Sequence, residues 1–201
     1  MLTTLSTLKT RLGIDEFDLS SDTILTNALT AISARFDKET NRTLARTTAA
    51  THEFSADDTE ICLACYPVES VTKFELKTNE TEGWLEQTNV EYLIRRACII
   101  SLPFPLCFPP SPISYLRSSV ARATYTGGFV LPGDTVGTGQ TLLPSDLEQA
   151  AVEQVSFWYQ NRDKLGLQRL WFHGGTYEQF AQLDLLLPVQ AVLKRYARWS
   201  I

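Results

Sequence analysis

Residues 145–160 read SDLEQAAVEQVSFWYQ, and this stretch decides how the C-terminal part of the chain folds. Its apolar residues recur at intervals of three and four, at Leu147, Ala151, Val155 and Trp158. This is the period of a helix that buries one face. Ser145 and Glu148 have the spacing of a capping box at the start of the helix, and Asn161 follows its end. An amphipathic helix of this kind needs another element to cover its apolar face.

The first 42 residues carry two further helical patterns. Thr4 can cap a short helix that ends at Gly13, and residues 20–22 supply capping oxygens for a second, longer helix. The second helix loses its periodicity within residues 40–42, where we expect it to end. Its predicted buried positions are Ile24, Leu25, Ala28, Leu29, Ile32 and Phe36.

After residue 163 we expect a loop, a short helix and a final helix. Glycines favour a loop over residues 164–176, and residues 177–185 are expected to form the short helix. Pro188 suits the first turn of the final helix. That helix has an apolar side at Val189, Val192, Leu193, Tyr196 and Trp199, and a basic side at Lys194, Arg195 and Arg198.

The middle of the chain, residues 43–130, has the shorter patterns that are typical of β-strands. We predict strands within the segments 47–54, 60–65, 71–77, 90–94 and 119–125. Gly127 and Gly128 end the last strand, and residues 131–141 are expected to form a loop.

Five prolines interrupt this β zone between residues 101 and 114. Proline fixes its own backbone torsion and donates no hydrogen bond, so we expect an extended loop here. The loop carries apolar side chains, including Phe104, Leu106 and Phe108. Two interpretations are open, since exposed apolar side chains need cover: the loop folds against its own domain, or these three residues contact an identical subunit.

Together these patterns predict an α+β fold. Residues 1–42 and 131–201 build a small helical bundle, and a central antiparallel β insertion, residues 43–130 with the proline-rich loop at 101–114, lies between them. We expect the 201 residues to form a single domain that ends in a C-terminal arm.

The charge balance argues against a general nucleic-acid-binding protein. Acidic residues outnumber basic ones by 23 to 18, which gives a formal charge of −5, whereas binding to phosphates requires a basic surface. No apolar run approaches the roughly 20 residues that span a bilayer, and the first residues have no signal-peptide pattern. The sequence therefore predicts a protein made in a cytoplasm, without a membrane segment.

The strongest candidate for chemistry is the C-x-x-C pair formed by Cys62 and Cys65. Such a pair can hold half of a zinc site or exchange disulfides. A second pair at similar spacing is missing, since Cys98 and Cys107 are nine residues apart. Residues i and i+3 of a strand also face opposite sides. We favour buried, inert cysteines, with a thiol- or metal-dependent enzyme centred on Cys62 and Cys65 as the alternative.

No other motif predicts catalysis. The histidines are His52 and His173, and no G-x-S-x-G nucleophile elbow accompanies them. The glycines at 133, 137 and 139 match no phosphate-binding loop. The sequence predicts no enzyme, and we expect no catalytic residue, no cofactor and no metal.

The order of several segments resembles a known family. The segments are LTTLSTLKTRLG at 2–13, ARFDKETNR at 34–42, YPVESV at 66–71, ATYTGGF at 123–129, LPSDLEQAA at 143–151 and WYQNRD at 158–163. Their succession resembles the head–tail connector (adaptor) proteins of tailed bacteriophages, the gp6-like and related prophage families.

The resemblance implies a structural function. Such adaptors form a ring, commonly of about twelve copies, beneath the portal of the filled capsid. The ring extends the DNA channel and docks the next neck or tail protein. The implied partners are therefore the portal protein, identical subunits and that next protein, while DNA passes through without specific binding. The implied location is the head–tail interface of the virion, after assembly in the host cytoplasm.

The resemblance also implies a role for residues 188–201, because the C-terminal segment reaches toward the portal in related adaptors. The candidate portal contacts are Lys194, Arg195, Tyr196, Arg198 and Trp199. An alternative is that the last helix only closes the bundle. A stopper or tail-completion protein, one layer further from the capsid, is the remaining alternative within the virion.

Overall fold

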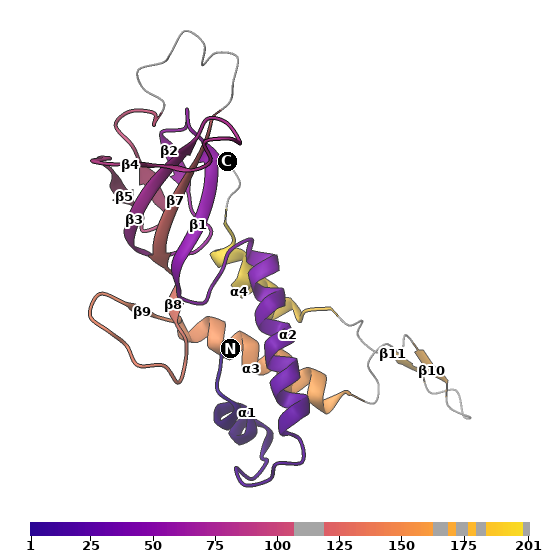
Figure 1. Cartoon of the computed structure of the whole chain (residues 1–201). Helices are drawn as coiled ribbons and strands as arrows, with labels where there is room; N and C mark the ends of the chain where they lie inside the picture. The colour runs from indigo at the N-terminus through magenta and orange to yellow at the C-terminus, as the bar shows by residue number, and fades with distance from the viewer. Residues whose placement is uncertain (107–118, 163–168, 172–176, 180–183, 199–201) are drawn as a thin grey trace. The chain divides into compact units, whose positions relative to one another are not determined.

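The computed structural model describes residues 1–106, 119–162, 169–171, 177–179 and 184–198, in two compact units (Figure 1). The helical unit draws on residues 1–40, 131–133 and 143–197, and the β unit on residues 41–130, 134–142 and 198–201. Helices from both ends of the chain and antiparallel sheets from its middle confirm the predicted α+β fold class. That the whole chain acts as a single connector domain stays a prediction.

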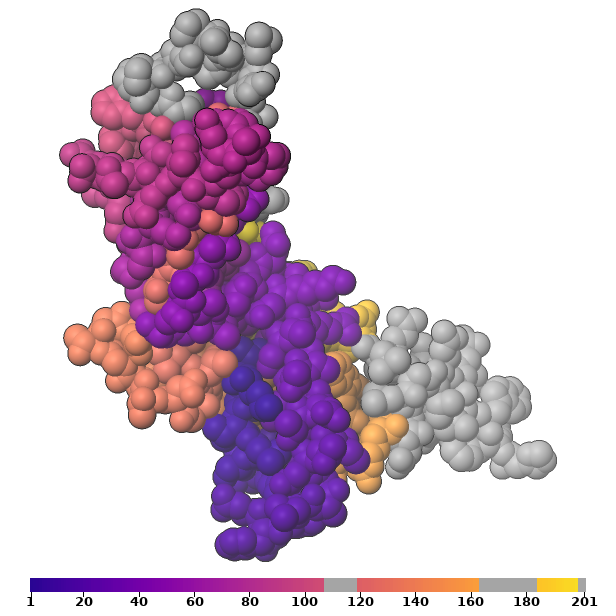
Figure 2. Space-filling model, viewed as in Figure 1, coloured from indigo at the N-terminus to yellow at the C-terminus, as the bar shows by residue number. Residues whose placement is uncertain are grey.

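Four helices build the helical unit: α1 (Leu5–Leu12), α2 (Asp22–Thr40), α3 (Ser145–Gln160) and α4 (Leu187–Tyr196). α3 contacts each of the other three, and α4 also contacts α2. Figure 2 shows the N-terminal residues in indigo beside the purple residues of α2, which α1 contacts. The last helix therefore packs onto the bundle, and whether it also contacts a portal stays a prediction. None of the described helices is both long and apolar enough to cross a bilayer.

At least one end of each of the four helices follows its predicted signal. The Thr4 hydroxyl accepts a hydrogen bond from the Thr7 N–H at 3.1 Å and caps α1, and Gly13 ends that helix with a left-handed φ of 69°. α2 ends at Thr40, and α3 is followed by Asn161 as its C-cap. Pro188 lies in the first turn of α4.

Two predictions about the helices are wrong. The capping box does not form, because α3 begins at Ser145 itself, after Pro144. The Glu148 carboxylate instead accepts a hydrogen bond from the Thr3 hydroxyl at 3.0 Å. The second wrong prediction is the burial of Ile24, which is 54% exposed. The buried stripe of α2 passes through Leu25, and a neighbouring residue is rotated about 100° around a helix with 3.6 residues per turn.

The expected short helix over 177–185 and loop over 164–176 are also wrong in their described parts. β10 (Arg169–Trp171) and β11 (Tyr177–Gln179) form an antiparallel pair, with Trp171 opposite Tyr177. A helix of nine residues is marginal without tertiary support. Aromatic residues favour strands, and pairing between two separate segments decides the outcome.

Most of the β unit consists of two antiparallel sheets. The first has the order β1 (Thr47–Ser55), β7 (Val120–Gly127), β3 (Val68–Lys77) and β4 (Leu85–Gln87). The second has the order β2 (Glu60–Cys62), β6 (Ile99–Ser101) and β5 (Leu93–Arg95). A parallel pair, β8 (Phe129–Val130) with β9 (Thr141–Leu142), completes the unit, so the loop expected over 131–141 ends in a strand.

One apolar cluster joins the two sheets. It contains Ile61 and Ile100 from the second sheet and Phe74, Ala123 and Tyr125 from the first. The Tyr125 hydroxyl accepts a hydrogen bond from the Cys65 N–H at 3.1 Å, which satisfies two buried polar groups inside this core. Each of the five predicted strand segments overlaps a strand, whereas β4, β6, β8 and β9 of this unit were not predicted.

Candidate functional site

The two thiols of the C-x-x-C pair have different environments. Cys62 is half-buried at the end of β2, whereas Cys65 is buried beyond that strand. The Cys65 thiol donates a hydrogen bond to the Gly127 carbonyl at 3.0 Å. A buried thiol in such a contact is a poor nucleophile, because reactive cysteines are partly exposed and lie in electropositive surroundings.

The Cys98 thiol is also a poor nucleophile. Burial raises the pKa of the Cys98 thiol, and nearby Cys62 raises this pKa further, so little thiolate is present at neutral pH. Cys107 lies outside the described residues. Within the part of the chain that the structure describes, no group of three or more His, Cys, Asp or Glu side chains could hold a metal ion. The arrangement gives no support to a thiol- or metal-dependent enzyme.

A polar cavity of about 330 Å³ lies beside His52 in the β unit, with Asp58, Glu60 and Arg198 in its lining. Burial lowers the pKa of His52, and the positive charge of Arg198 lowers this pKa further. The imidazole is therefore neutral at pH 7. The Arg198 guanidinium donates a hydrogen bond to the Cys62 carbonyl at 2.5 Å. His173 lies outside the described residues.

The candidate portal contacts have different environments. Lys194 and Arg195 are exposed in the last turn of α4. The Tyr196 hydroxyl donates a hydrogen bond to the Asp146 carboxylate at 2.7 Å and so helps to hold α4 against α3. Arg198 makes the contact with β2 described above, and Trp199 lies outside the described residues. The portal contact of these residues stays a prediction.

The candidate subunit contacts also differ from one another. Phe104 is 64% exposed. Leu106 packs against the core of the β unit, and its N–H donates a hydrogen bond to the Ala56 carbonyl at 3.1 Å. Leu106 thus follows the interpretation in which the loop folds against its own domain. Phe108 lies outside the described residues, and a subunit contact through Phe104 stays a prediction.

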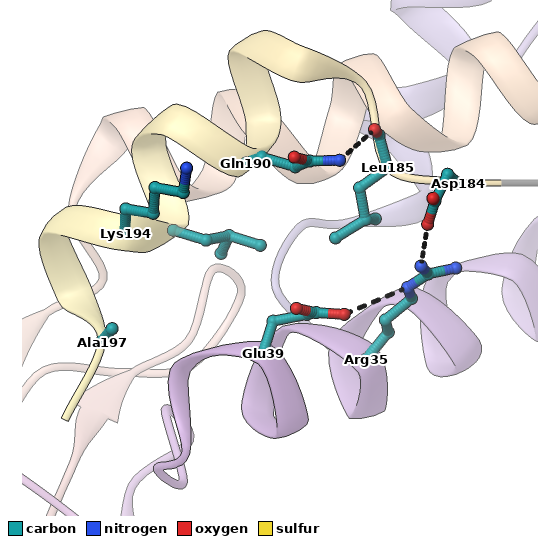
Figure 3. Close-up of a pocket in the computed structure, with 8 residues that line it drawn as sticks. Arg35, Glu39, Asp184, Leu185, Gln190, Lys194 and Ala197 are labelled. Atoms are coloured by element: carbon teal, nitrogen blue, oxygen red, sulfur yellow. Dashed lines mark hydrogen bonds and ion pairs between the residues drawn. The ribbon is translucent and has the colours of Figure 1, made fainter. Parts of the chain in front are cut away.

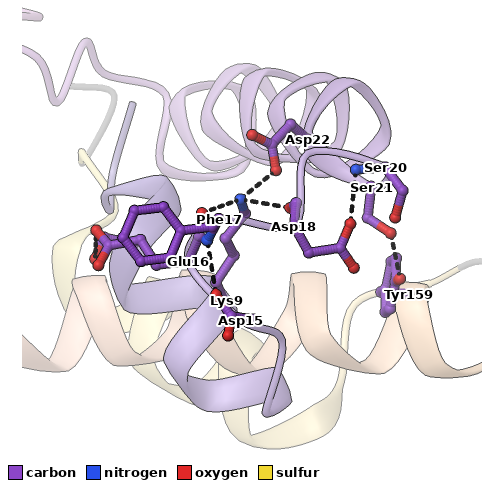
Figure 4. Close-up of polar contacts among 10 residues, drawn as sticks. Lys9, Asp15, Glu16, Phe17, Asp18, Ser20, Ser21, Asp22 and Tyr159 are labelled. Carbon is purple, nitrogen blue, oxygen red and sulfur yellow. Dashed lines mark hydrogen bonds and ion pairs between the residues drawn. The ribbon is translucent and has the colours of Figure 1, made fainter.

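Residues 14–21 connect α1 to α2, and we call them the acidic loop because they include Asp15, Glu16 and Asp18. The loop is built around Lys9 of α1, whose side chain is only 4% exposed (Figure 4). The Lys9 ammonium donates hydrogen bonds to the carbonyls of Glu16 at 3.0 Å and Asp18 at 2.8 Å. It also forms an ion pair with Asp22 at 2.6 Å.

Two apolar side chains of the acidic loop face solvent. Phe17 is 89% exposed and Leu19 is 72% exposed. The loop backbone beside them is held in place, since the Asp15 carboxylate accepts a hydrogen bond from the Phe17 N–H at 2.9 Å. Sequence reasoning missed both residues because they belong to no helical or strand period. A sequence signal that could have identified them is the occurrence of two large apolar residues, Phe17 and Leu19, among acidic residues shortly after Gly13, the glycine that ends α1.

A cavity of about 200 Å³ lies between α2 and α4 in the same unit (Figure 3). Leu185 and Leu193 are buried and form its apolar floor. Arg35, Glu39 and Lys194 lie at its edge. Arg35 forms an ion pair with Asp184 at 2.7 Å and a longer one with Glu39 at 3.7 Å.

A buried carboxylate, Glu75, organises one face of the first sheet. It is 6% exposed and forms ion pairs with Lys73 at 3.0 Å and Arg122 at 2.8 Å. The Arg122 guanidinium also stacks on the Trp84 ring at 4.2 Å. Burial by itself raises the pKa of Glu75, but hydrogen bonds from Lys73 and Arg122 outweigh it, and the pKa lies below its ordinary value of 4.5.

We expect Glu75→Gln to destabilise the β unit at neutral pH by about 1–3 kcal/mol, because Arg122 loses its buried partner. A lowered folded-state pKa means that the carboxylate stabilises the fold fully above the unfolded pKa, and that this stabilisation is lost as pH falls through the folded pKa. The variant should therefore lose less stability than the parent between neutral pH and acid pH. Urea unfolding at several pH values measures this, with the exposed Glu86→Gln as control. An unchanged pH dependence would contradict the prediction.

The fold is similar to that of chains in two solved structures of gene transfer agent particles. A chain in "Neck of empty GTA particle computed with C6 symmetry" matches with a TM-score of 0.58 at 16% identity, over 98% of this chain and 89% of that chain. A chain in "Virion of native gene transfer agent (GTA) particle" matches with a TM-score of 0.56 at 16% identity, with the same coverage. No protein-family model matches the chain, and no curated protein matches its sequence. At this identity, the likeness is one of fold.

Proposed function

We propose that this chain is a structural subunit of the neck of a phage-like particle, where it acts as an adaptor between the portal protein and the next neck or tail protein. The observation that carries the proposal is the likeness of fold, over 98% of the chain, to a chain in a structure of a gene transfer agent neck. The order of sequence segments from residues 2–13 to 158–163 supports the same assignment independently.

The proposed assembly is a ring of about twelve copies, in which each copy offers two different surfaces to its neighbours. A ring of this size is compatible with the C6 symmetry of the neck structure, since twelve is a multiple of six. The exposed Lys194 and Arg195 are the proposed portal contacts of the described residues, and Phe104 is a proposed subunit contact.

The proposed function is mechanical and not catalytic. The environments of Cys65 and Cys98 favour inert thiols, and the polar cavity beside His52 brings together no nucleophile and base within hydrogen-bond distance among the described residues. A net charge of −5 per chain disfavours tight binding to phosphates. DNA would therefore pass the ring without being held.

The test is to remove the gene and to examine the particles that remain. We expect DNA-filled heads without tails, restored to tailed particles when the gene is supplied again. In restored particles, mass spectrometry should detect the chain, and an image reconstruction should place it directly below the portal. A position one layer further from the capsid would identify a stopper or tail-completion protein instead. Absence of the chain from purified particles would refute the proposal.

A further inference from the structure

The polar cavity beside His52 lies where edge strands of the two sheets of the β unit meet. β1 is an edge strand of the first sheet and β2 is an edge strand of the second, and both contribute residues to the cavity wall. His52 is opposite Ala123 in the register of β1 and β7, so its side chain is on the face of the sheet that carries the apolar core. An ionisable imidazole is therefore half-buried at the edge of this core.

Arg198 brings a permanent positive charge into the same cavity. Residues 143–197 belong to the helical unit, and the chain returns to the β unit at Arg198. The Arg198 guanidinium donates a hydrogen bond to the Cys62 carbonyl at 2.5 Å, and its Nε–H is buried without a hydrogen-bond partner among the described residues. A guanidinium keeps its charge in proteins. Because this one is partly removed from water, a second cation nearby would repel it more strongly than it would in bulk solvent.

The charge state of His52 and the position of Arg198 influence each other. Burial lowers the pKa of His52, and the positive charge of Arg198 lowers this pKa further. Such a coupling between two events is reciprocal. If Arg198 disfavours the charged imidazole, then a charged imidazole disfavours the Arg198 contact by the same free energy. Protonation of His52 places two cations in one cavity of about 330 Å³.

Two carboxylates of the cavity wall have other partners. Glu60 is more than half exposed and forms an ion pair with Arg95 at 3.3 Å. The exposed Asp58 carboxylate accepts a hydrogen bond from the Ser55 N–H at 3.3 Å. Solvent and salt screen exposed charges of this kind, so neither carboxylate cancels the repulsion between the two cations.

The other ionisable groups near His52 leave this balance in place. Glu53, the next residue of β1, raises the pKa of His52, but by less than Arg198 lowers it. Tyr125 of β7 is neutral at pH 7, because burial raises its pKa. The Cys62 thiol also lines the cavity and carries no positive charge in either protonation state.

We propose that protonation of His52 releases Arg198 from the β unit, so that their shared cavity acts as a pH-sensitive latch. At neutral pH the Cys62 carbonyl holds the guanidinium, which is then not available to another protein. In acid the released guanidinium can pair with a carboxylate of a partner. The inference does not depend on the proposed function, because it concerns a contact within one unit of one chain.

The direction of the pH dependence follows from the lowered pKa of His52. The latch is fully closed above the ordinary pKa of histidine, where the imidazole is neutral in both the closed and the open state. It opens as pH falls through the lowered pKa of the closed state.

The first measurement is an NMR titration of the protein with isotope-labelled imidazoles. The histidines of the sequence are His52 and His173, so His173→Gln assigns the signal of His52. We expect Arg198→Met to raise the pKa of His52, because a neighbouring cation is removed. Arg195→Met removes an exposed guanidinium that does not line this cavity, and this matched control should leave the pKa of His52 unchanged.

The second measurement is the exchange of the Arg198 Nε–H with water, since this group is buried in the closed latch. Between about pH 8 and about pH 5 the imidazole gains its charge. Over this range we expect the exchange rate of Arg198, relative to that of the exposed Arg195, to rise at least about fivefold. His52→Gln carries no charge at any pH and should abolish the rise.

Two results would overturn the latch: an unchanged pKa of His52 in Arg198→Met, or a constant relative exchange rate of Arg198 across this pH range. If His52→Gln does not fold, the comparison of Arg198→Met with Arg195→Met still decides, because neither of these side chains is fully buried. Absence of the chain from purified particles refutes the proposed function and leaves the latch unaffected.

Discussion

Gly128→Ala is expected to unfold the β unit or to destabilise it by more than about 3 kcal/mol, because strain and steric overlap add together. Gly128 has a φ of 101°, which L-residues with a side chain rarely adopt. A methyl group there would lie 2.6 Å from the Ala45 carbonyl oxygen and 2.8 Å from the Arg46 Cα. Both atoms belong to backbone, so no side chain can turn aside to make room.

Three backbone segments meet at this position. The Gly128 N–H donates to the Pro67 carbonyl at 2.9 Å, and the Phe129 N–H donates to the Leu44 carbonyl at 2.8 Å. Any shift that relieves the overlap would therefore break hydrogen bonds between the end of β7 and its neighbours. Amide hydrogen exchange, resolved by peptide, should show faster exchange in β1, β3 and β7.

The matched control is Gly139→Ala. Gly139 also has a positive φ, of 81°, but a methyl group there would meet no atom within 4 Å. We expect a cost of only about 1–2 kcal/mol, which is the strain of a left-handed residue alone. Equal effects of the two substitutions would show that steric overlap at Gly128 contributes nothing.

Lys9→Met is expected to destabilise the helical unit by about 3 kcal/mol, as when one partner of a buried ion pair is removed. Methionine fills a similar volume but cannot donate hydrogen bonds, so two carbonyls and the Asp22 carboxylate lose their partner. Denaturant unfolding gives the change in stability. Hydrogen exchange should increase in α1 and in residues 14–21.

Lys38→Met provides the comparison, because Lys38 is exposed in the last turn of α2. We expect a change within about 0.5 kcal/mol, as for most surface substitutions. If Lys9→Met is as mild as this control, the buried ammonium does not hold the acidic loop in place.

Local sequence patterns predicted all four described helices, although they also predicted a helix over 177–185 that the described residues there do not form. The boundaries of α1 and α2 follow from Thr4, Gly13 and the loss of period near Thr40, because capping and the i to i+4 hydrogen bond involve residues close in the chain. The five strand segments were recognisable for a similar reason, since alternation and turn residues are local. The fold class followed from the order of these elements.

Only the tertiary structure decided which apolar side chains of the acidic loop face solvent. Phe17 and Leu19 follow no period, and their exposure depends on contacts that Lys9 makes with residues seven and nine positions away. The cavity beside Lys194 requires α2 and α4, which are separated by more than a hundred residues. Such sites are set by long-range packing, which no short window of sequence contains.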